Sequence, residues 1–328
     1  MLKPILAGDG WRPLFTPQKT GAYVNDHCVV RAHDGRWHVF GITKPTADLD
    51  PNGERWFCHG SGPALGAGGF EEHWKVCDFG TRAWAPAIAW SGERWVMLYG
   101  PDRLRAAVCD DDRLDHWREA PCSLVGAPVE AVLRDGMIFR LDDDSWLLYA
   151  TGKRGRCGAV SVCVSENLLD WRFVRFALVT TPAAPLQPSW AATESPFVFR
   201  HDGAYWLSIT YTRSFGGPAE YHNTLLFRST NAFDFGTYSG DDEHELAARL
   251  YAHAPEYVQD PDSALPQIEL PLGKLGRTPG GCTVAYSPEA FATTHCEWWR
   301  IRSHNTVLSA VLPPSRMAKA HHLTARTC

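Results

Sequence analysis

An internal repeat is the strongest constraint on the fold of this sequence. Four stretches share one form, a polar turn followed by an aromatic-rich alternating run, at residues 34–40, 91–99, 143–149 and 202–209. An apolar, strand-like run precedes each of them, at residues 28–30, 87–90, 137–139 and 197–199. A strand, a tight turn and a second strand make a β-hairpin. The repeat therefore predicts one hairpin in each of four units.

A second element follows each hairpin, a strand whose polar turn closes on an aromatic residue. The closing residues are Trp74, Trp117, Trp171 and Phe235. A weaker fifth unit is expected, with its first strand at residues 253–258 and its end near residues 293–299. The Pro- and Gly-rich segment at about residues 260–281 predicts a surface loop between them.

Five such units predict an all-β fold, a single-domain five-bladed β-propeller, because radial closure removes the exposed sheet edges. We expect an N-terminal segment at residues 1–20, the propeller at residues 21–312 and a C-terminal tail at residues 313–328. The alternative is a β-sandwich in which the hairpins resemble one another by chance.

Composition excludes several classes of partner. The chain has 328 residues with a formal charge of −5 and no long basic run, so neither a nucleic-acid nor an anionic-membrane surface is indicated. No window of 18 consecutive apolar residues occurs, and the start lacks the apolar region of a signal peptide. We therefore expect a cytoplasmic protein with reduced thiols, of which Cys28, Cys163 and Cys282 are core residues. No Cys-x-x-Cys pair occurs, so we expect no structural zinc site.

Three carboxylates precede the apolar runs of the first, third and fourth units. They are Asp26, Asp135 and Glu194. The first strands of propeller blades converge on the central channel, so these residues, at matching positions of their repeats, are expected to face one axial pocket. Converging carboxylates repel, and each must find a partner or shift its pKa. Each one taken alone would be a solvated turn residue.

The residues around these carboxylates carry a resemblance to a known family. The motifs, in chain order, are Asn25-Asp26, Trp84-Ala85-Pro86, Arg134-Asp135, Glu194-Ser195-Pro196 and His253-Ala254-Pro255. In order and spacing, over about residues 20–300, they resemble the motifs of the five-bladed propeller glycoside hydrolases. These are the clans of the family 43 arabinofuranosidases and xylosidases and the family 32 invertases and levanases. His27 and Gly136 depart from the pattern, since these families usually carry proline there.

The resemblance implies a role for one residue of each motif. Asp26 would be the general base or nucleophile, Asp135 would tune a pKa or stabilise the transition state, and Glu194 would be the general acid. Trp84 would line the sugar pocket. His253 would lie near the channel, where the histidine of some relatives holds a water or an ion. We expect no required cofactor, and a channel calcium or sodium ion is left open.

Further binding residues are suggested by their chemistry. Trp84 and Trp190 are candidates for a sugar platform, because the C–H faces of sugar rings pack on indole. His27 is either a hydrogen-bond donor to substrate or a structural histidine. Arg134 either holds Asp135 ionised or makes a surface salt bridge.

Two carboxylates that flank a glycosidic bond can hydrolyse it, one by protonating the leaving oxygen and one by activating water or attacking carbon. A third carboxylate keeps the acid protonated by like-charge repulsion. We expect a glycosidase for a small glycoside, oligosaccharide or glycosylated metabolite of the furanoside, pentoside or fructoside class. Whether the reaction inverts or retains the anomeric configuration depends on the distance between the two carboxyl groups, which a sequence does not give. The alternatives are a non-hydrolytic metabolite-tailoring enzyme, a sugar-binding protein, or a phosphorolytic enzyme.

Overall fold

Every regular element in the described part of the chain is a β-strand. The computed structural model describes residues 12–18, 23–45, 47–65, 69–101, 103–128, 134–141, 145–182, 193–201, 203–211, 223–240, 246–250, 253–258, 270–274 and 284–286. No helix in these ranges is long and apolar enough to cross a membrane. The predicted all-β class is confirmed.

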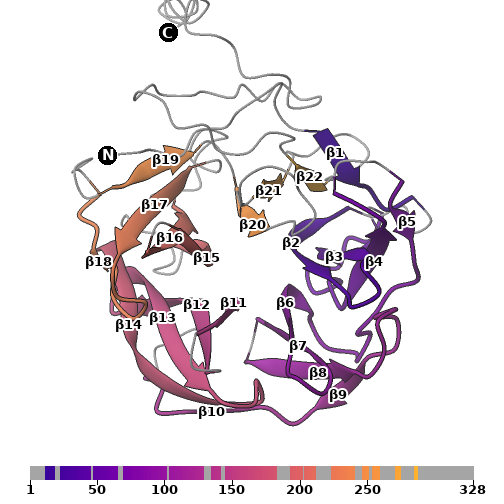
Figure 1. Cartoon of the computed structure of the whole chain (residues 1–328), viewed down its shortest axis with the longest axis horizontal. Helices are drawn as coiled ribbons and strands as arrows, with labels where there is room; N and C mark the ends of the chain where they lie inside the picture. Colours follow the sequence, from indigo (N-terminus) through magenta and orange to yellow (C-terminus); the bar gives the residue numbers. More distant parts are fainter. Residues whose placement is uncertain are drawn as a thin grey trace, which may run out of the picture.

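Four antiparallel up-and-down sheets follow one another around a ring (Figure 1). Blade 1 contains β2 (Asn25–Arg31), β3 (Trp37–Thr43), β4 (Trp56–Gly62) and β5 (Glu71–Glu72). Blade 2 contains β6 (Trp84–Trp90), β7 (Trp95–Gly100), β8 (Arg105–Cys109) and β9 (Arg118–Ala120). Blade 3 contains β11 (Arg134–Arg140), β12 (Trp146–Arg154), β13 (Cys157–Ser165) and β14 (Asp170–Pro182). Blade 4 contains β15 (Glu194–His201), β16 (Ala204–Thr210), β17 (Thr224–Ser229) and β19 (Ala248–Leu250).

Two short strands extend blade 3 at its outer edge. Both β10 (Ser123–Val125) and β18 (Gly236–Thr237) pair in parallel with β14. Since β10 follows blade 2 in the chain and β18 lies between strands of blade 4, they tie blade 3 to both of its neighbours. The predicted propeller arrangement is confirmed.

A further sheet joins the two ends of the described chain. Its order is β1 (Arg12–Phe15), β22 (Val284–Tyr286), β21 (Leu270–Lys274) and β20 (Glu256–Val258), and we call it the closing sheet. The predicted first strand of the fifth unit, at residues 253–258, is a strand only over its second half, as β20. The surface loop predicted at about residues 260–281 is wrong in part, because it contains β21, and the predicted end near residues 293–299 lies outside the described residues. The count of five blades stays a prediction.

The innermost strands form a closed circle of contacts. β2 contacts β6, β6 contacts β11, β11 contacts β15, β15 contacts β20, and β20 contacts β2. Figure 1 shows these strands nearest the centre of the ring. The residues at the start of these strands are therefore brought together around one axis.

The middle strands explain why the sheets pack as a ring. All residues of β3 and β7, and the first seven of β12, are buried. Successive residues of a strand point to opposite faces, so unbroken burial means that both faces of the sheet are covered. A sheet with two apolar faces needs a neighbour on each side, and the ring supplies both.

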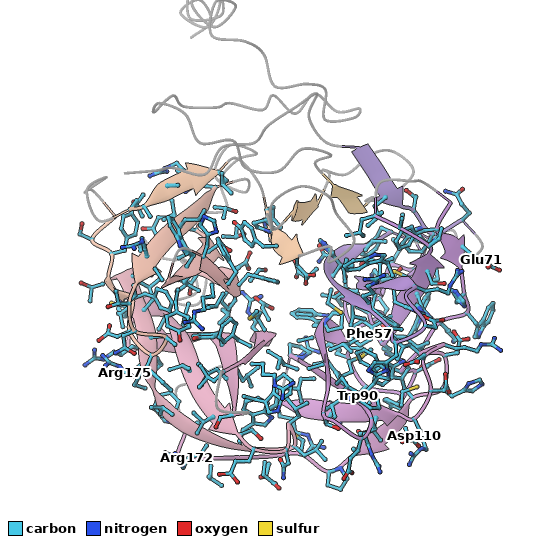
Figure 2. All side chains as sticks on the ribbon, viewed as in Figure 1. Phe57, Glu71, Trp90, Asp110, Arg172 and Arg175 are labelled. Atoms are coloured by element: carbon cyan, nitrogen blue, oxygen red, sulfur yellow. The ribbon has the colours of Figure 1, made fainter. Side chains whose placement is uncertain are left out.

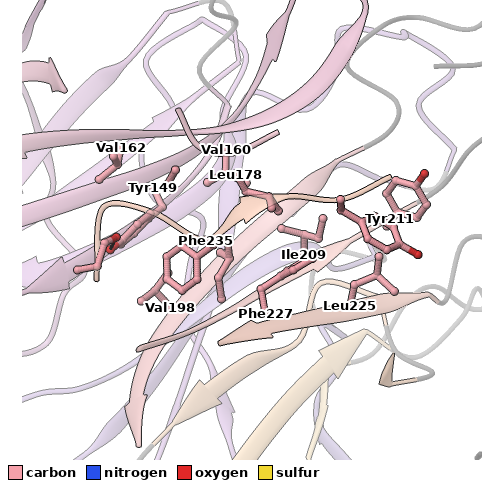
Figure 3. Close-up of a cluster of buried hydrophobic side chains, with 14 of the residues drawn as sticks. Tyr149, Val160, Val162, Leu178, Val198, Ile209, Tyr211, Leu225, Phe227 and Phe235 are labelled. Atoms are coloured by element: carbon pink, nitrogen blue, oxygen red, sulfur yellow. Dashed lines mark hydrogen bonds between the residues drawn. The ribbon is translucent and has the colours of Figure 1, made fainter. Parts of the chain in front are cut away.

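The hydrophobic clusters lie between blades. Between blades 3 and 4, Tyr149, Ile209 and Phe227 belong to one cluster (Figure 3), in which the Tyr149 hydroxyl donates to the carbonyl of Ala232 at 2.7 Å. Phe57 lies in the cluster between blades 1 and 2, whereas Figure 2 shows charged side chains such as Asp110 at the outer rim. As predicted, Cys28 and Cys163 are buried and free, and Cys282 lies outside the described residues.

The aromatic residue predicted to close each unit is buried in three of the four units. Trp117, Trp171 and Phe235 are buried. The Trp171 indole N–H donates to the carbonyl of Leu168 at 2.9 Å, and Trp117 makes the equivalent bond within its own turn. In the first unit the prediction is wrong, because Trp74 is 70% exposed. Val76 and Cys77 are buried there instead, since Val76 pairs with Phe57 of β4 and draws the chain inward two residues later.

Replacing a closing tryptophan tests this packing. Trp171→Ala should lower the free energy of unfolding by about 3–5 kcal/mol, the usual cost of removing a buried tryptophan. The matched control is Trp74→Ala, which removes an exposed indole and should change it by less than about 0.5 kcal/mol. Urea unfolding followed by circular dichroism measures both, and similar losses in the two variants would contradict the assigned burial.

Candidate functional site

The start of each inner strand has an unusual backbone. In blades 2, 3 and 4 the first residue pairs normally with the middle strand, and the register then shifts over the next two residues. The second residue of each of these three strands has a positive φ: Ala85 (48°), Asp135 (53°) and Ser195 (47°). Ala254, two residues before β20, has one as well (48°). A non-glycine residue in this region costs about 1–2 kcal/mol. Strain that recurs at one place in four repeats indicates a functional constraint.

The register corrects one prediction about the carboxylates. Asp26 and Asp135 are each the second residue of an inner strand, as predicted for matching positions. Glu194 is the first residue of its strand, which is the place of Arg134 in blade 3 and Trp84 in blade 2. The sequence spacing already contains this offset, because Asp135 stands two residues before its apolar run at 137–139 and Glu194 stands three before its run at 197–199. The same one-residue bulge follows in both strands.

A buried arginine links two of the predicted catalytic residues. Arg134 Nη2 lies 2.8 Å from Glu194 Oε1, and Arg134 Nη1 lies 3.2 Å from Asp135 Oδ2. The Arg134 and Glu194 side chains are only 11% and 12% exposed. The alternative of a surface salt bridge for Arg134 is therefore wrong. The Ser195 backbone N–H donates to Asp135 Oδ2 at 3.3 Å, so blades 3 and 4 are joined twice at this point.

The electrostatics distinguish Glu194 from an ordinary surface carboxyl. Burial and the nearby negative charges of Asp135 and Asp26 raise the pKa of Glu194 to about 7, against the opposing effect of Arg134. A carboxyl with this pKa holds its proton about half of the time near neutral pH. That is the range in which a group can donate a proton and recover it.

Asp26 faces this group from blade 1. Its Oδ1 lies 3.8 Å from Nε2 of His253, whose side chain is 3% exposed. The Ala254 backbone N–H, next to His253, donates to the Thr210 hydroxyl of blade 4 at 2.8 Å. The predicted residues Asp26, Asp135, Glu194, Arg134 and His253 are thus brought together around the axis.

A cavity of about 240 Å³ runs along the axis between the inner strands. Asp26, His27 and Asp135 are among the residues that line it, and the predicted binding residue His27 is buried. Trp84 is half-buried, packs against the cluster between blades 1 and 2, and has the Arg82 guanidinium 5.2 Å from its ring. Trp190 lies outside the described residues.

Glu256 is a channel residue that the sequence reasoning did not single out. Its Oε2 accepts a hydrogen bond from the backbone N–H of Val29 at 2.9 Å, which joins β20 to β2. Burial, with the charge of Asp26, raises the pKa of Glu256 well above its usual range, against the effect of the Val29 bond. Its position directly after the His253-Ala254-Pro255 motif is the sequence feature that could have identified it.

Comparison with known proteins adds the following. No family model and no curated protein matches the sequence. Among solved structures, a thermostable family 43 glycoside hydrolase has 14% identity and a TM-score of 0.57, over 84% of this chain and 96% of that chain. The family 43 enzyme of Xanthomonas citri in complex with xylotriose has 15% identity and a TM-score of 0.59, over 91% and 93%. A family 117 glycoside hydrolase of Zobellia galactanivorans has 10% identity and a TM-score of 0.58, over 84% and 88%. At these identities the likeness establishes a shared β-propeller fold.

The raised pKa of Glu194 predicts a pH-dependent stability. A carboxyl whose pKa is higher folded than unfolded contributes stability below the unfolded value and loses it as pH rises through the folded value. Between about pH 4.5 and 8, the wild type should therefore lose about 1–3 kcal/mol of unfolding free energy relative to Glu194→Gln. Urea titrations at several pH values measure this. The control Glu93→Gln changes an exposed turn residue, and parallel curves for wild type and Glu194→Gln would show that the assigned pKa is wrong.

Proposed function

We propose that this protein is a glycoside hydrolase that cleaves a small glycoside at the mouth of the axial channel. Glu194 is the general acid, Asp26 is the base or nucleophile, and Asp135 adjusts the pKa of the acid. The observation that carries the proposal is the buried Arg134, which holds Glu194 and Asp135 together, while burial and the charges of Asp135 and Asp26 keep a proton on Glu194.

This arrangement supplies both halves of the reaction. Protonated Glu194 gives its proton to the leaving oxygen, and Asp26, on the opposite side of the axis, activates a water molecule or attacks the anomeric carbon. As Glu194 becomes an anion, the Arg134 guanidinium 2.8 Å away is already in place to stabilise it. Inversion and retention both remain open.

The remaining predicted residues are assigned to binding. His27 lines the channel beside Asp26 and would contact a substrate hydroxyl. Trp84 would present its indole to the sugar ring, and His253 would orient Asp26. Trp190 stays a predicted second platform. A channel calcium or sodium ion also stays a prediction, as does the cytoplasmic location.

The substrate class is the pentoside or furanoside class. Two solved structures of the Xanthomonas citri enzyme contain xylotriose and xylose, and another similar structure is an arabinanase of Bacillus subtilis. Those ligands belong to those proteins, and they support a small sugar here because this chain shares their fold and opens an axial cavity beside Asp26 and Asp135. A fructoside is the alternative within the class.

We also propose that the closing sheet is the fifth blade. It packs on both neighbours, since Leu14 and Phe15 of β1 share a cluster with blade 1 and Tyr257 of β20 shares one with blade 4. β20 also completes the circle of inner-strand contacts. The propeller domain at residues 21–312 then includes all the strands of the closing sheet but β1, which reaches it from the N-terminal segment.

A second candidate function is a non-hydrolytic enzyme or a sugar-binding protein. His27 and Gly136 favour it, because both line the channel where the hydrolase motifs usually carry proline. A panel of aryl pentosides, furanosides and fructosides distinguishes the two. Turnover of any of them supports hydrolysis, whereas saturable binding without turnover supports the second candidate.

The first test concerns Asp26. Asp26→Asn should lower kcat by several orders of magnitude on any accepted glycoside, because an amide neither activates water nor attacks carbon. Its Tm should stay near the wild-type value. The matched control is Asp110→Asn at the outer rim, which should keep full activity, and near-normal turnover of Asp26→Asn would remove Asp26 from the mechanism.

The second test separates acid catalysis from binding at Glu194. Glu194→Gln should slow hydrolysis of an alkyl glycoside by about 10²–10⁴-fold, because an alkoxide leaves only with a proton. A nitrophenyl glycoside should lose far less, since nitrophenolate leaves unaided. The descent of rate near pH 7 should also disappear. Equal losses on both substrates with an unchanged pH profile would make Glu194 a binding residue.

A further inference from the structure

A second cluster of titratable side chains lies away from the channel, where blades 1 and 2 meet. His59 lies on β4, His73 directly follows β5, and Asp115 lies in the turn between β8 and β9. One ligand atom from each of the three residues lies within 4.8 Å of the other two. The glycosidase chemistry proposed above does not use any of them.

We propose that His59, His73 and Asp115 form a binding site for one divalent transition-metal ion, with Zn²⁺ the best fit, that ties blade 1 to blade 2. Two imidazoles and a carboxylate suit zinc and its neighbours in the first transition series. A water molecule would complete a tetrahedron.

The distances fit this geometry. The Nδ1 atoms of His59 and His73 lie 3.2 Å and 3.3 Å from the same oxygen, Oδ1 of Asp115. In a tetrahedral zinc site with bonds of about 2.0–2.1 Å, the ligand atoms are separated by about 3.3 Å. Two of the three distances between ligand atoms therefore match a tetrahedral site, and the ligand atoms of all three residues lie within 4.8 Å of one another.

The imidazole of His59 has Asp115 as its close partner at Nδ1. The His59 side chain is fully buried, at 0% exposure, and its Nδ1 lies 3.2 Å from Asp115 Oδ1 without the alignment of a good hydrogen bond. An ion between the two atoms would satisfy both.

The other ring nitrogens are arranged as in known metal sites. His59 Nε2 lies 2.9 Å from His38 Nδ1, and His73 Nε2 lies 2.7 Å from the Ser61 hydroxyl. Ser61 in turn accepts a hydrogen bond from Arg36 at 2.9 Å. Metal-binding histidines usually bond through the second nitrogen, which fixes the ring and leaves the first for the metal.

Access also agrees with an ion. The His73 and Asp115 side chains are 20% and 17% exposed, so an ion can enter from solvent and keep one water. The sequence prediction of no structural zinc rested on cysteine spacing alone. It could not find ligands at positions 59, 73 and 115, which no short motif connects.

The test uses the full chain, stripped with EDTA, dialysed and titrated with Zn²⁺ and with Co²⁺. We expect one Zn²⁺ per chain by calorimetry and elemental analysis, and a Tm that rises with the concentration of free Zn²⁺. The Co²⁺ form should show the visible bands of a four-coordinate site without thiolate charge transfer. Asp115→Asn and His73→Ala, both partly exposed positions, should weaken Zn²⁺ binding by more than about 100-fold.

The matched control is His33→Ala. His33 pairs with Asp112 at 2.8 Å across the same two blades, but no third ligand joins them in the described chain. This variant should bind Zn²⁺ like the wild type. If Zn²⁺ shows no saturable binding, the cluster is held by hydrogen bonds alone and the proposal is wrong. Stoichiometric binding that survives both Asp115→Asn and His73→Ala, or a thiolate signature with Co²⁺, would overturn it as well.

Discussion

The structure depends on sheets that are apolar on both faces. β3 and β7 are buried at every position, and a strand with this pattern cannot lie at a surface. Each sheet therefore needs two neighbours, and sheets that all need two neighbours are satisfied together only in a closed ring. Closure brings the inner strands to one axis, where β2, β6, β11, β15 and β20 contact one another in turn. The site is a consequence of this packing, because the ring gathers residues that are remote in sequence.

At the axis, several carboxyls compete for few compensating charges. Asp26, Asp135, Glu194 and Glu256 lie around the centre, and Arg134 is the cation that contacts two of them. Burying so much negative charge is costly, and the structure reduces the cost by keeping protons on the two glutamates, whose pKa values are both raised. Burial and two carboxylates outweigh the adjacent guanidinium at Glu194. Arg134 therefore fixes the position of the acid without removing its proton.

Features that recur in several blades could be predicted from the sequence, whereas most features that occur in one blade could not. The hairpins, the all-β class and the convergence of Asp26, Asp135 and Arg134 follow from a pattern seen in several units. The offset of Glu194 by one residue could have been counted from its distance to the apolar run at 197–199. The exposure of Trp74 could not, because it depends on a local bridge between Phe57 and Val76 that leaves no periodic signal.

Contacts between blades escape sequence reasoning for a related reason. Asp115 meets His59 and His73 only because blade 2 packs on blade 1, and Glu256 meets Val29 only because β20 lies against β2. The first contact joins the outer strands of two blades and the second joins two inner strands, in both cases across an apolar interface that has no directional preference of its own. Polar pairs at such interfaces fix the rotation of one blade against the next. The proposed acid Glu194 and the proposed base Asp26 come from different blades and need that rotation to be fixed, because an error of about 1 Å in placing a reacting group can cost about 100-fold in rate.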